Sequence, residues 1–241
     1  MKKKIIAIIV AIVLIIPVSR GWYEFLLDNF FDAELASSTQ FSSTQLKFRK
    51  ISDTEVEVVE YDSDLHGSIT IPEKIRIGLD IYKVTSIGAS AFYRSISLTS
   101  IKIPEGVTSI GKWAFSDCRS LEPKLLVYDK GTKCYGWIGN VEKCTNVVIP
   151  DGVTSIGAGA FLGCSSLTSI KIPKSVTSIG SYAFRGCSSL TSINIPDGVT
   201  SIGEEAFWGC SNLEIVIDNS ENNVKVEESA FKGCKSVKWL K

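Results

Sequence analysis

The sequence predicts a repeat solenoid of the α+β class: about seven β-rich coils with parallel strands and short helical turns, closed at the N-terminus by a β cap. Two observations lead to this prediction. Residues 153–173, VTSIGAGAFLGCSSLTSIKIP, return almost unchanged as residues 176–196, VTSIGSYAFRGCSSLTSINIP. An Ala-Phe pair recurs at steps of 23, 46, 23, 23 and 24 residues, at Ala91-Phe92, Ala114-Phe115, Ala160-Phe161, Ala183-Phe184, Ala206-Phe207 and Ala230-Phe231. A fixed period of this length is typical of coils that bury their apolar side only by stacking on one another.

The first 21 residues, MKKKIIAIIVAIVLIIPVSRG, are typical of an export segment. The uncharged run from Ile5 to Ser19 would span roughly 22 Å as a helix at about 1.5 Å per residue, short of the roughly 30 Å hydrocarbon core of a membrane. This favours a signal peptide cleaved near Ser19-Arg20-Gly21, and an uncleaved signal anchor is the alternative. With either, the protein is expected to be exported, secreted or membrane-anchored, and to lie at the cell surface or in the cell envelope.

Residues 22–46 are expected to join the export segment to the folded part. Trp22, Phe25, Leu26 and Phe30 fall on one stripe of a helix, which suggests a short amphipathic helix on a membrane or against the domain. The low-complexity run SSTQFSSTQ that follows is typical of a polar linker. The simpler interpretation is a tether.

Residues 47–83 are expected to form the N-terminal β cap. Apolar residues alternate with polar ones at Val56 and Val58, at Ile69 and Ile71, and at Ile75 and Ile77. This alternation predicts strands that cover the open end of the first coil.

The solenoid itself is expected over residues 84–241, and each piece of the repeat has a structural interpretation. The run LTSIKIP places Ile170 and Ile172 on one face of a strand, which Pro173 ends because proline has no N–H to donate. VTSIG predicts a second short strand. SYAFRGC predicts one helical turn in which Phe184 and Cys187 face inward.

One unit of the solenoid is irregular. The step of 46 residues is two periods, so a degenerate unit is expected over about residues 121–150, with Trp137-Ile138 in the place of Ala-Phe.

The repeated pattern Val-Thr-Ser-Ile-Gly-x-x-Ala-Phe-x-x-Cys-x-x-Leu-x-x-Ile-x-Ile-Pro resembles the 23-residue leucine-rich repeat of the BspA type, found in bacterial surface proteins. The resemblance covers about residues 84–241, and residues 51–88 resemble the N-terminal cap of that family. It implies a secreted or surface-exposed protein that binds other proteins, as adhesins of the family do, and it brings no catalytic residues with it.

Composition gives no sign of an enzyme or of a nucleic-acid-binding protein. Lys plus Arg and Asp plus Glu both number 26, so no basic excess marks a nucleic-acid partner. His66 is the single histidine, and its surroundings, SDLHGS, suggest a polar turn of the cap. The phosphate-binding motifs G-x-x-x-x-G-K-[ST] and G-x-G-x-x-G are absent. We therefore expect no catalytic, metal-binding or cofactor-binding site.

The cysteines are expected to be structural. Five of the seven recur at one repeat position: Cys118, Cys164, Cys187, Cys210 and Cys234. Stacked equivalents point in parallel, which favours a ladder of buried thiols over disulfides and over a tetrahedral metal site. Cys134 and Cys144, in the irregular unit, either bridge a local loop or stay free.

Two surfaces are candidates for partner binding. Around the Ala-Phe pair the units vary most, with aromatic and arginine residues that are typical of binding hot spots or that pack on neighbouring coils: Tyr93, Arg94, Trp113, Leu162, Tyr182, Arg185 and Trp208. The strand face gives a second row at a step of 23: Lys102, Leu125, Val148, Lys171, Asn194 and Ile217. From the second row Lys102 and Lys171 are the candidate binding residues, and Leu125 and Val148 would form an apolar patch.

The sequence therefore predicts an exported cell-surface protein that binds protein ligands or mediates adhesion to host or neighbouring cells. The alternative is a structural component of the cell envelope without a host ligand. The open C-terminal coil, which includes Val237–Lys241, would expose strand edges that invite self-association.

Overall fold

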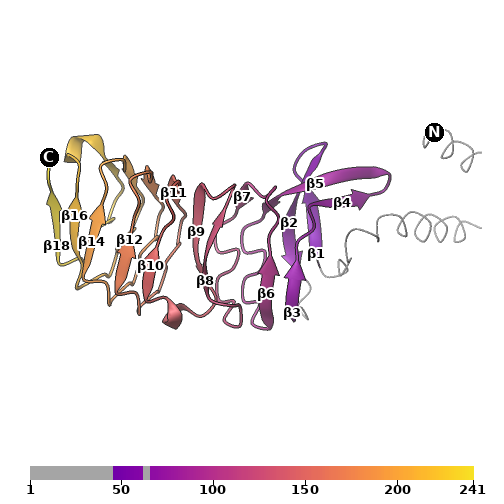
Figure 1. Cartoon of the computed structure of the whole chain (residues 1–241), viewed down its shortest axis with the longest axis horizontal. Helices are drawn as coiled ribbons and strands as arrows, with labels where there is room; N and C mark the ends of the chain where they lie inside the picture. The colour runs from indigo at the N-terminus through magenta and orange to yellow at the C-terminus, as the bar shows by residue number, and fades with distance from the viewer. Residues whose placement is uncertain (1–45, 62–65) are drawn as a thin grey trace, which may run out of the picture. The chain divides into compact units, whose positions relative to one another are not determined.

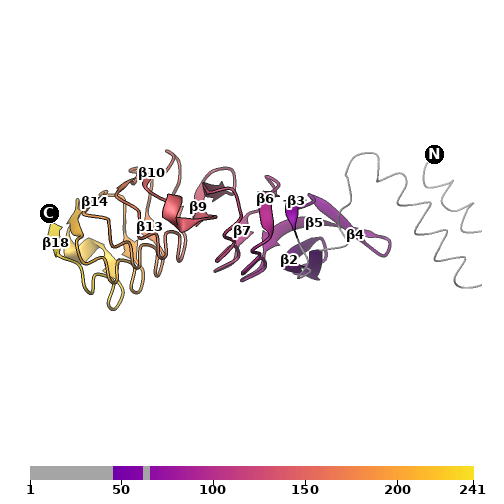
Figure 2. The ribbon, with the colours of Figure 1, turned by 90° about the horizontal axis from the view of Figure 1, so that it is seen from below.

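The computed structural model describes residues 46–61 and 66–241, so the predicted export segment and tether lie outside the described residues. Over the described ranges the chain winds into a β-solenoid of about seven coils, stacked from β5 to β18 (Figures 1 and 2), which confirms the predicted fold class. Nothing within 46–61 and 66–241 forms a helix of the length and apolar character that crossing a membrane requires.

The N-terminal sheet has five strands in the order β1-β2-β5-β4, with β7 pairing β5 on a side branch. β1 and β4 run antiparallel to their neighbours, and the β2/β5 and β5/β7 pairs are parallel. The strands are β1 (Leu46–Lys50), β2 (Glu55–Tyr61), β4 (Lys74–Ile77), β5 (Asp80–Ile87) and β7 (Ser109–Ile110). Val56 and Val58 are fully buried, as the alternation predicted. β5 joins this cap to the first coil because it runs on into the first VTSIG segment.

A six-stranded sheet continues the VTSIG strands, in the order β17-β15-β13-β11-β9-β8. All its pairs are parallel except β8/β9. The strands are β8 (Lys124–Tyr128), β9 (Lys133–Ile138), β11 (Ser155–Ile156), β13 (Ser178–Ile179), β15 (Ser201–Ile202) and β17 (Lys225–Val226).

The LTSIKIP strands form three smaller parallel sheets, β3-β6, β10-β12 and β14-β16-β18. They are β3 (Gly67–Thr70), β6 (Leu98–Lys102), β10 (Asn146–Val148), β12 (Ser169–Lys171), β14 (Ser192–Ile195), β16 (Glu214–Ile217) and β18 (Ser236–Trp239). Ile69 of β3 lies opposite Ile101 of β6, so part of the predicted cap already extends the ladder of the repeats. The two described 3-10 helices are η2 (Val141–Lys143) and η3 (Glu221–Asn223).

The segment around each Ala-Phe pair is a hydrogen-bonded turn and not the predicted helical turn. Tyr182 and Gly186, on either side of Phe184, have φ of +61° and +75°, a left-handed conformation that ends an α-helix. The Phe184 amide donates to the Ala206 carbonyl of the next coil at 2.7 Å, so the turns also hydrogen-bond from coil to coil.

The core is a stack of equivalent side chains, as the repeat predicted. Phe161, Phe184 and Phe207 are fully buried, with ring centroids 5.2 and 5.1 Å apart and nearly parallel planes. The recurring cysteines are buried behind them, except Cys234, which is half-buried in the last coil. Cys187 and Cys210 each donate through Sγ to the carbonyl of a core phenylalanine, Phe161 at 3.2 Å and Phe184 at 3.0 Å.

All seven cysteines are free thiols, which agrees with the predicted ladder. Cys134 and Cys144 do not bridge. Cys134 lies in β9 opposite Ile156, whereas Cys144 is buried in the same core cluster as Cys164.

Buried thiols make the fold sensitive to alkali. Burial raises the pKa of Cys118 to about 11 and that of Cys134 to about 12. Because the raised values favour the protonated folded state, their stabilisation is complete below about pH 9 and is lost as the pH rises toward 11 and 12. At pH 10 each thiol is expected to lower the free energy of unfolding by about 1.4 kcal/mol, measured by denaturant unfolding at pH 8 and pH 10.

The control for this prediction is a Cys118→Ala, Cys134→Ala variant, which should lose less stability between the two pH values than the parent chain does. An unchanged pH dependence in the variant would show that other groups cause the alkaline loss.

The irregular unit is a β-hairpin in which β8 and β9 pair antiparallel, and the core divides there into two clusters. Trp137 donates its amide to the Ala160 carbonyl at 2.8 Å, the bond that the phenylalanine makes in regular coils. The predicted equivalence, with Trp137 in the place of Ala and Ile138 in that of Phe, is therefore one residue out, and the local structure is a strand and not a turn. Across the break the Phe115 amide donates to the Tyr135 hydroxyl at 3.0 Å, so a side chain replaces the missing carbonyl.

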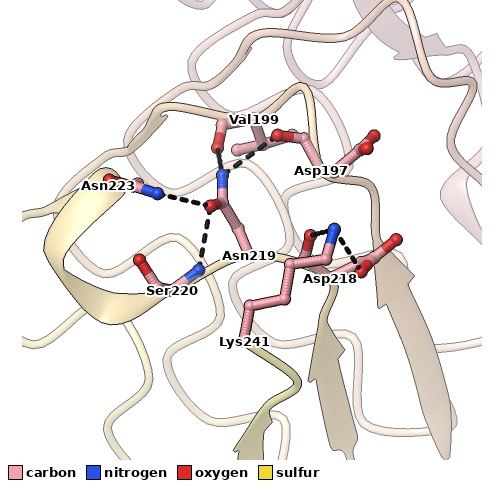
Figure 3. Close-up of polar contacts among 7 residues, drawn as sticks. All are labelled: Asp197, Val199, Asp218, Asn219, Ser220, Asn223 and Lys241. Carbon is pink, nitrogen blue, oxygen red and sulfur yellow. Dashed lines mark hydrogen bonds and ion pairs between the residues drawn. The ribbon is translucent and has the colours of Figure 1, made fainter.

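The final coils depart from the repeat at Asn219 (Figure 3). Its Nδ2 donates to the carbonyls of Asp197 and Val199 at 3.0 and 3.3 Å, while its Oδ1 accepts from the Ser220 amide at 2.8 Å. Lys241 lies 3.0 Å from the Asp218 carboxylate. The side chain of Asn219 thus hydrogen-bonds the longer turn of the last coil to the coil before it.

Candidate protein-binding surface

We call the turn ridge the row of side chains two residues before and one residue after the core phenylalanine, or its equivalent, of each coil. In each regular coil the amide of the second position donates to the carbonyl of the first, as from Arg185 to Tyr182 at 3.2 Å and from Trp208 to Glu205 at 3.1 Å. The side chains at both positions therefore project from a tight turn. Four large apolar side chains of the ridge are exposed by 38–48%: Tyr93, Trp113, Leu162 and Trp208.

Arg185 is the centre of the largest polar cluster on the turn ridge. Its guanidinium lies 4.6 Å from the ring centroid of Trp208 and 5.7 Å from that of Tyr182. Its Nη1 lies 3.0 Å from the buried Oε2 of Glu205. The aromatic faces and the carboxylate hold the guanidinium in one orientation, with about two-fifths of the side chain still exposed.

A smaller cluster of the same kind lies on the first two coils. Arg94 lies 5.2 Å from the ring centroid of Tyr93 and 3.7 Å from the Asp117 carboxylate of the next coil. Both clusters combine an arginine, an aromatic side chain and an acid from the adjacent coil.

Trp113 extends along the ridge across the irregular unit. Its indole Nε1 lies 4.0 Å from the position that a Cβ on Gly159 would occupy, two periods further along the chain. The hairpin between these two coils has no Ala-Phe turn and so adds no side chain to the ridge. The indole of Trp113 lies in the gap that this leaves.

Several ridge residues adopt a left-handed backbone although they are not glycine. Trp113, Tyr182 and Glu205 have φ of +57°, +61° and +48°, and the equivalent residue in another coil is Gly159, with φ +67°. A side chain in this conformation costs about 1–2 kcal/mol, more than glycine does. Bulky aromatic residues at such positions are unfavourable for folding, which is typical of residues kept for contacts outside the fold.

Lys102 and Lys171 are exposed but lie on other strands, β6 and β12, in separate sheets. The structure therefore brings five of the candidates onto the turn ridge, with Arg94 one residue beyond it, and leaves these two lysines outside it. The predicted strand-face row is wrong at two positions. Leu125 leaves the row for the six-stranded sheet because its strand turns into the hairpin, and Ile217 is buried while Val216 lies beside Asn194. Val148 is 67% exposed without its predicted neighbour.

Two acids that pair with the arginines, Asp117 and Glu205, were not predicted from the sequence. Both occupy the variable positions beside the core phenylalanine, and an opposite charge one coil away was the signal that could have found them. Within 46–61 and 66–241, no three histidine, cysteine, aspartate or glutamate side chains lie close enough together to hold a metal ion.

Comparison with known protein families gives one match. The BspA type leucine rich repeat region matches residues 66–126 and 136–241 in six copies, which is more than half of the chain. No curated protein matches.

Two solved structures illustrate the similarity. A leucine-rich cell surface protein from Faecalibacterium prausnitzii is 31% identical, with a TM-score of 0.52, and the match covers 77% of this chain and 56% of that one. A leucine-rich repeat protein from Bacteroides ovatus is 29% identical, with a TM-score of 0.48, and the match covers 83% of this chain and 53% of that one. The chain thus spans about half the length of each of these relatives.

Proposed function

Because this chain belongs to the BspA-type leucine-rich repeat family, we propose that it is a non-enzymatic binding protein that holds a protein partner on its turn ridge. The observation that carries this proposal is the cluster of Arg185, Tyr182 and Trp208. An arginine held between aromatic rings, with exposed edges, is the side-chain combination that is enriched at binding hot spots.

The solenoid supports this function by fixing the ridge before a partner arrives. Each ridge turn is hydrogen-bonded within itself, and most are also bonded to the next coil, as from the Tyr182 amide to the Glu204 carbonyl at 2.9 Å. Little side-chain and backbone freedom remains to be lost on binding, so more of the contact energy appears as affinity.

We place this function at the cell surface, as adhesion to host or neighbouring cells. The export segment expected at residues 1–21 and the surface location that the Faecalibacterium relative's name gives to that protein support this location. Protease shaving of intact source cells tests it. Peptides of residues 84–241 released without lysis would support a surface protein, whereas peptides seen only after lysis would favour a structural component of the envelope.

A Trp113→Ala, Trp208→Ala variant is expected to keep its fold and to lose most of its affinity for the partner. Truncation of a hot-spot side chain costs about 2 kcal/mol or more, or about thirtyfold in Kd for each residue. The loss can be measured by titrating labelled protein onto intact cells that bind the parent chain.

A Lys171→Ala variant on the strand face, outside the turn ridge, is the matched control and should bind as the parent does. Unchanged affinity in the tryptophan variant, or a larger loss in the lysine variant, would move the binding surface away from the turn ridge.

A further inference from the structure

The irregular unit leaves a groove between the second coil and the hairpin. It has a volume of about 630 Å³. On one side lie residues 101–105, the end of β6 and the turn after it, and on the other lie residues 124–131, β8 and the turn after it. Its apolar lining includes Ile101, Ile103, Leu126 and Val127. The groove belongs to neither the turn ridge nor the two clusters described above.

The groove is where a strand of the regular solenoid is missing. The Glu122 amide still donates to the Thr99 carbonyl at 3.0 Å, as the next coil does elsewhere. Pro123 then has no N–H to donate, and the chain turns away as β8 into the other sheet. Among the described strands, β6 therefore pairs only with β3 and keeps one open edge.

On this open edge, one backbone amide lacks a backbone acceptor. Ile71 and Ile149 are, like Ile103, the isoleucines of an Ile-Pro pair. The Ile71 amide donates to the Lys102 carbonyl at 2.9 Å, and the Ile149 amide donates to the Lys171 carbonyl at 3.1 Å. The Ile172 amide also lacks a backbone acceptor, but β12 contacts β14 there, whereas Ile103 lines the groove and its amide has no backbone acceptor in the described part of the chain. An added strand would supply one.

The rim of the groove is basic. Lys102, Lys124 and Lys130 are exposed, and none of them forms an ion pair with another described residue. Of the two acids in the lining, Asp129 is paired with Lys133 at 3.0 Å, which leaves Glu105. Three unpaired cations against one unpaired anion favour an acidic ligand.

From the open edge, the apolar lining and the basic rim, we propose that this groove binds an extended acidic peptide segment of a partner protein, as a strand added to β6. Side chains of an extended peptide alternate between two faces, so apolar residues would enter the groove while carboxylates between them meet the lysines. This site does not depend on the proposed function of the turn ridge.

The test uses the full-length protein and a fluorescein-labelled peptide, Ser-Glu-Val-Glu-Val-Glu-Ser, followed by fluorescence anisotropy. Saturable binding is expected, with at least a tenfold loss of affinity in a Lys124→Glu, Lys130→Glu variant. Lys143→Glu, an exposed charge reversal outside the groove, is the matched control and should bind normally. Slower amide hydrogen exchange at residues 101–105 on binding would support addition to the β6 edge.

Three results would overturn the proposal. They are equal binding of the glutamine version of the peptide, unchanged affinity in the Lys124→Glu, Lys130→Glu variant, and no saturation up to about 1 mM. A dimer dissociated by the same lysine changes would assign the groove to a second copy and would also overturn it. The Trp113→Ala, Trp208→Ala variant should still bind the peptide, which separates this test from that of the turn ridge.

Discussion

Replacing Phe184 by alanine is expected to lower the free energy of unfolding by about 3–5 kcal/mol. Phe184 is fully buried and stacks between Phe161 and Phe207, with ring centroids 5.2 and 5.1 Å away. Its loss leaves a cavity between two coils that backbone hydrogen bonds hold at a fixed spacing, so the neighbouring rings cannot close it. Urea unfolding followed by circular dichroism measures the loss.

Phe231→Ala is the matched control because Phe231 is only partly buried and stacks on one side alone, 5.9 Å from Phe207. Its loss should be clearly smaller. Equal losses for the two variants would contradict the view that the stacked core carries the stability of the solenoid.

Gly203→Ala is expected to destabilise the chain by about 3 kcal/mol or more. A Cβ at Gly203 would lie 2.4 Å from the Ser181 amide nitrogen and 2.7 Å from the Gly180 carbonyl carbon, both backbone atoms of the preceding coil. Since backbone cannot move aside as a side chain can, the two coils would have to separate. Thermal and urea unfolding both report this change.

Gly209→Ala provides the comparison. Gly209 has φ +77° and no atom within 4 Å of the place of a Cβ, so only the cost of the left-handed conformation, about 1–2 kcal/mol, is expected. A larger effect at Gly209 than at Gly203 would contradict the close contact between coils.

The period and the inward-facing residues could be predicted because each coil repeats the same packing problem. Phe184, Cys187 and Ile179 are buried as their spacing indicated. The left-handed turns were not predicted, because Trp113 and Tyr182 occupy positions where glycine is the usual signal. Their backbone conformation is imposed by the stacked coils and not by their own preference.

The irregular unit could be located but not described from the repeat alone. Its hairpin has a local sequence signal, two apolar runs on either side of Asp129-Lys130-Gly131. A search for a 23-residue period does not detect this signal, because it occurs once in the chain. The role of Tyr135, whose hydroxyl replaces a backbone carbonyl, depends on a contact across 20 residues that no local pattern shows.

Five of the eight candidate binding residues lie on the turn ridge and a sixth, Arg94, lies one residue beyond it, because variable positions in a repeat fall on one line once the coils stack. The predicted strand-face row is wrong at Leu125 and Ile217, because a step of 23 residues finds equivalent positions only where the coils are regular. Pro123 ends that regularity at the groove.

The central claim is that a protein partner is bound on the turn ridge, and site-specific photo-crosslinking on intact cells tests it most directly. A photoreactive phenylalanine analogue would replace Trp208 on the turn ridge, Lys171 on the strand face, or Glu142 in η2, each in a separate sample. The account predicts a saturable, higher-mass crosslinked product from position 208 and none from positions 171 and 142. A product from position 171 with none from position 208 would contradict it.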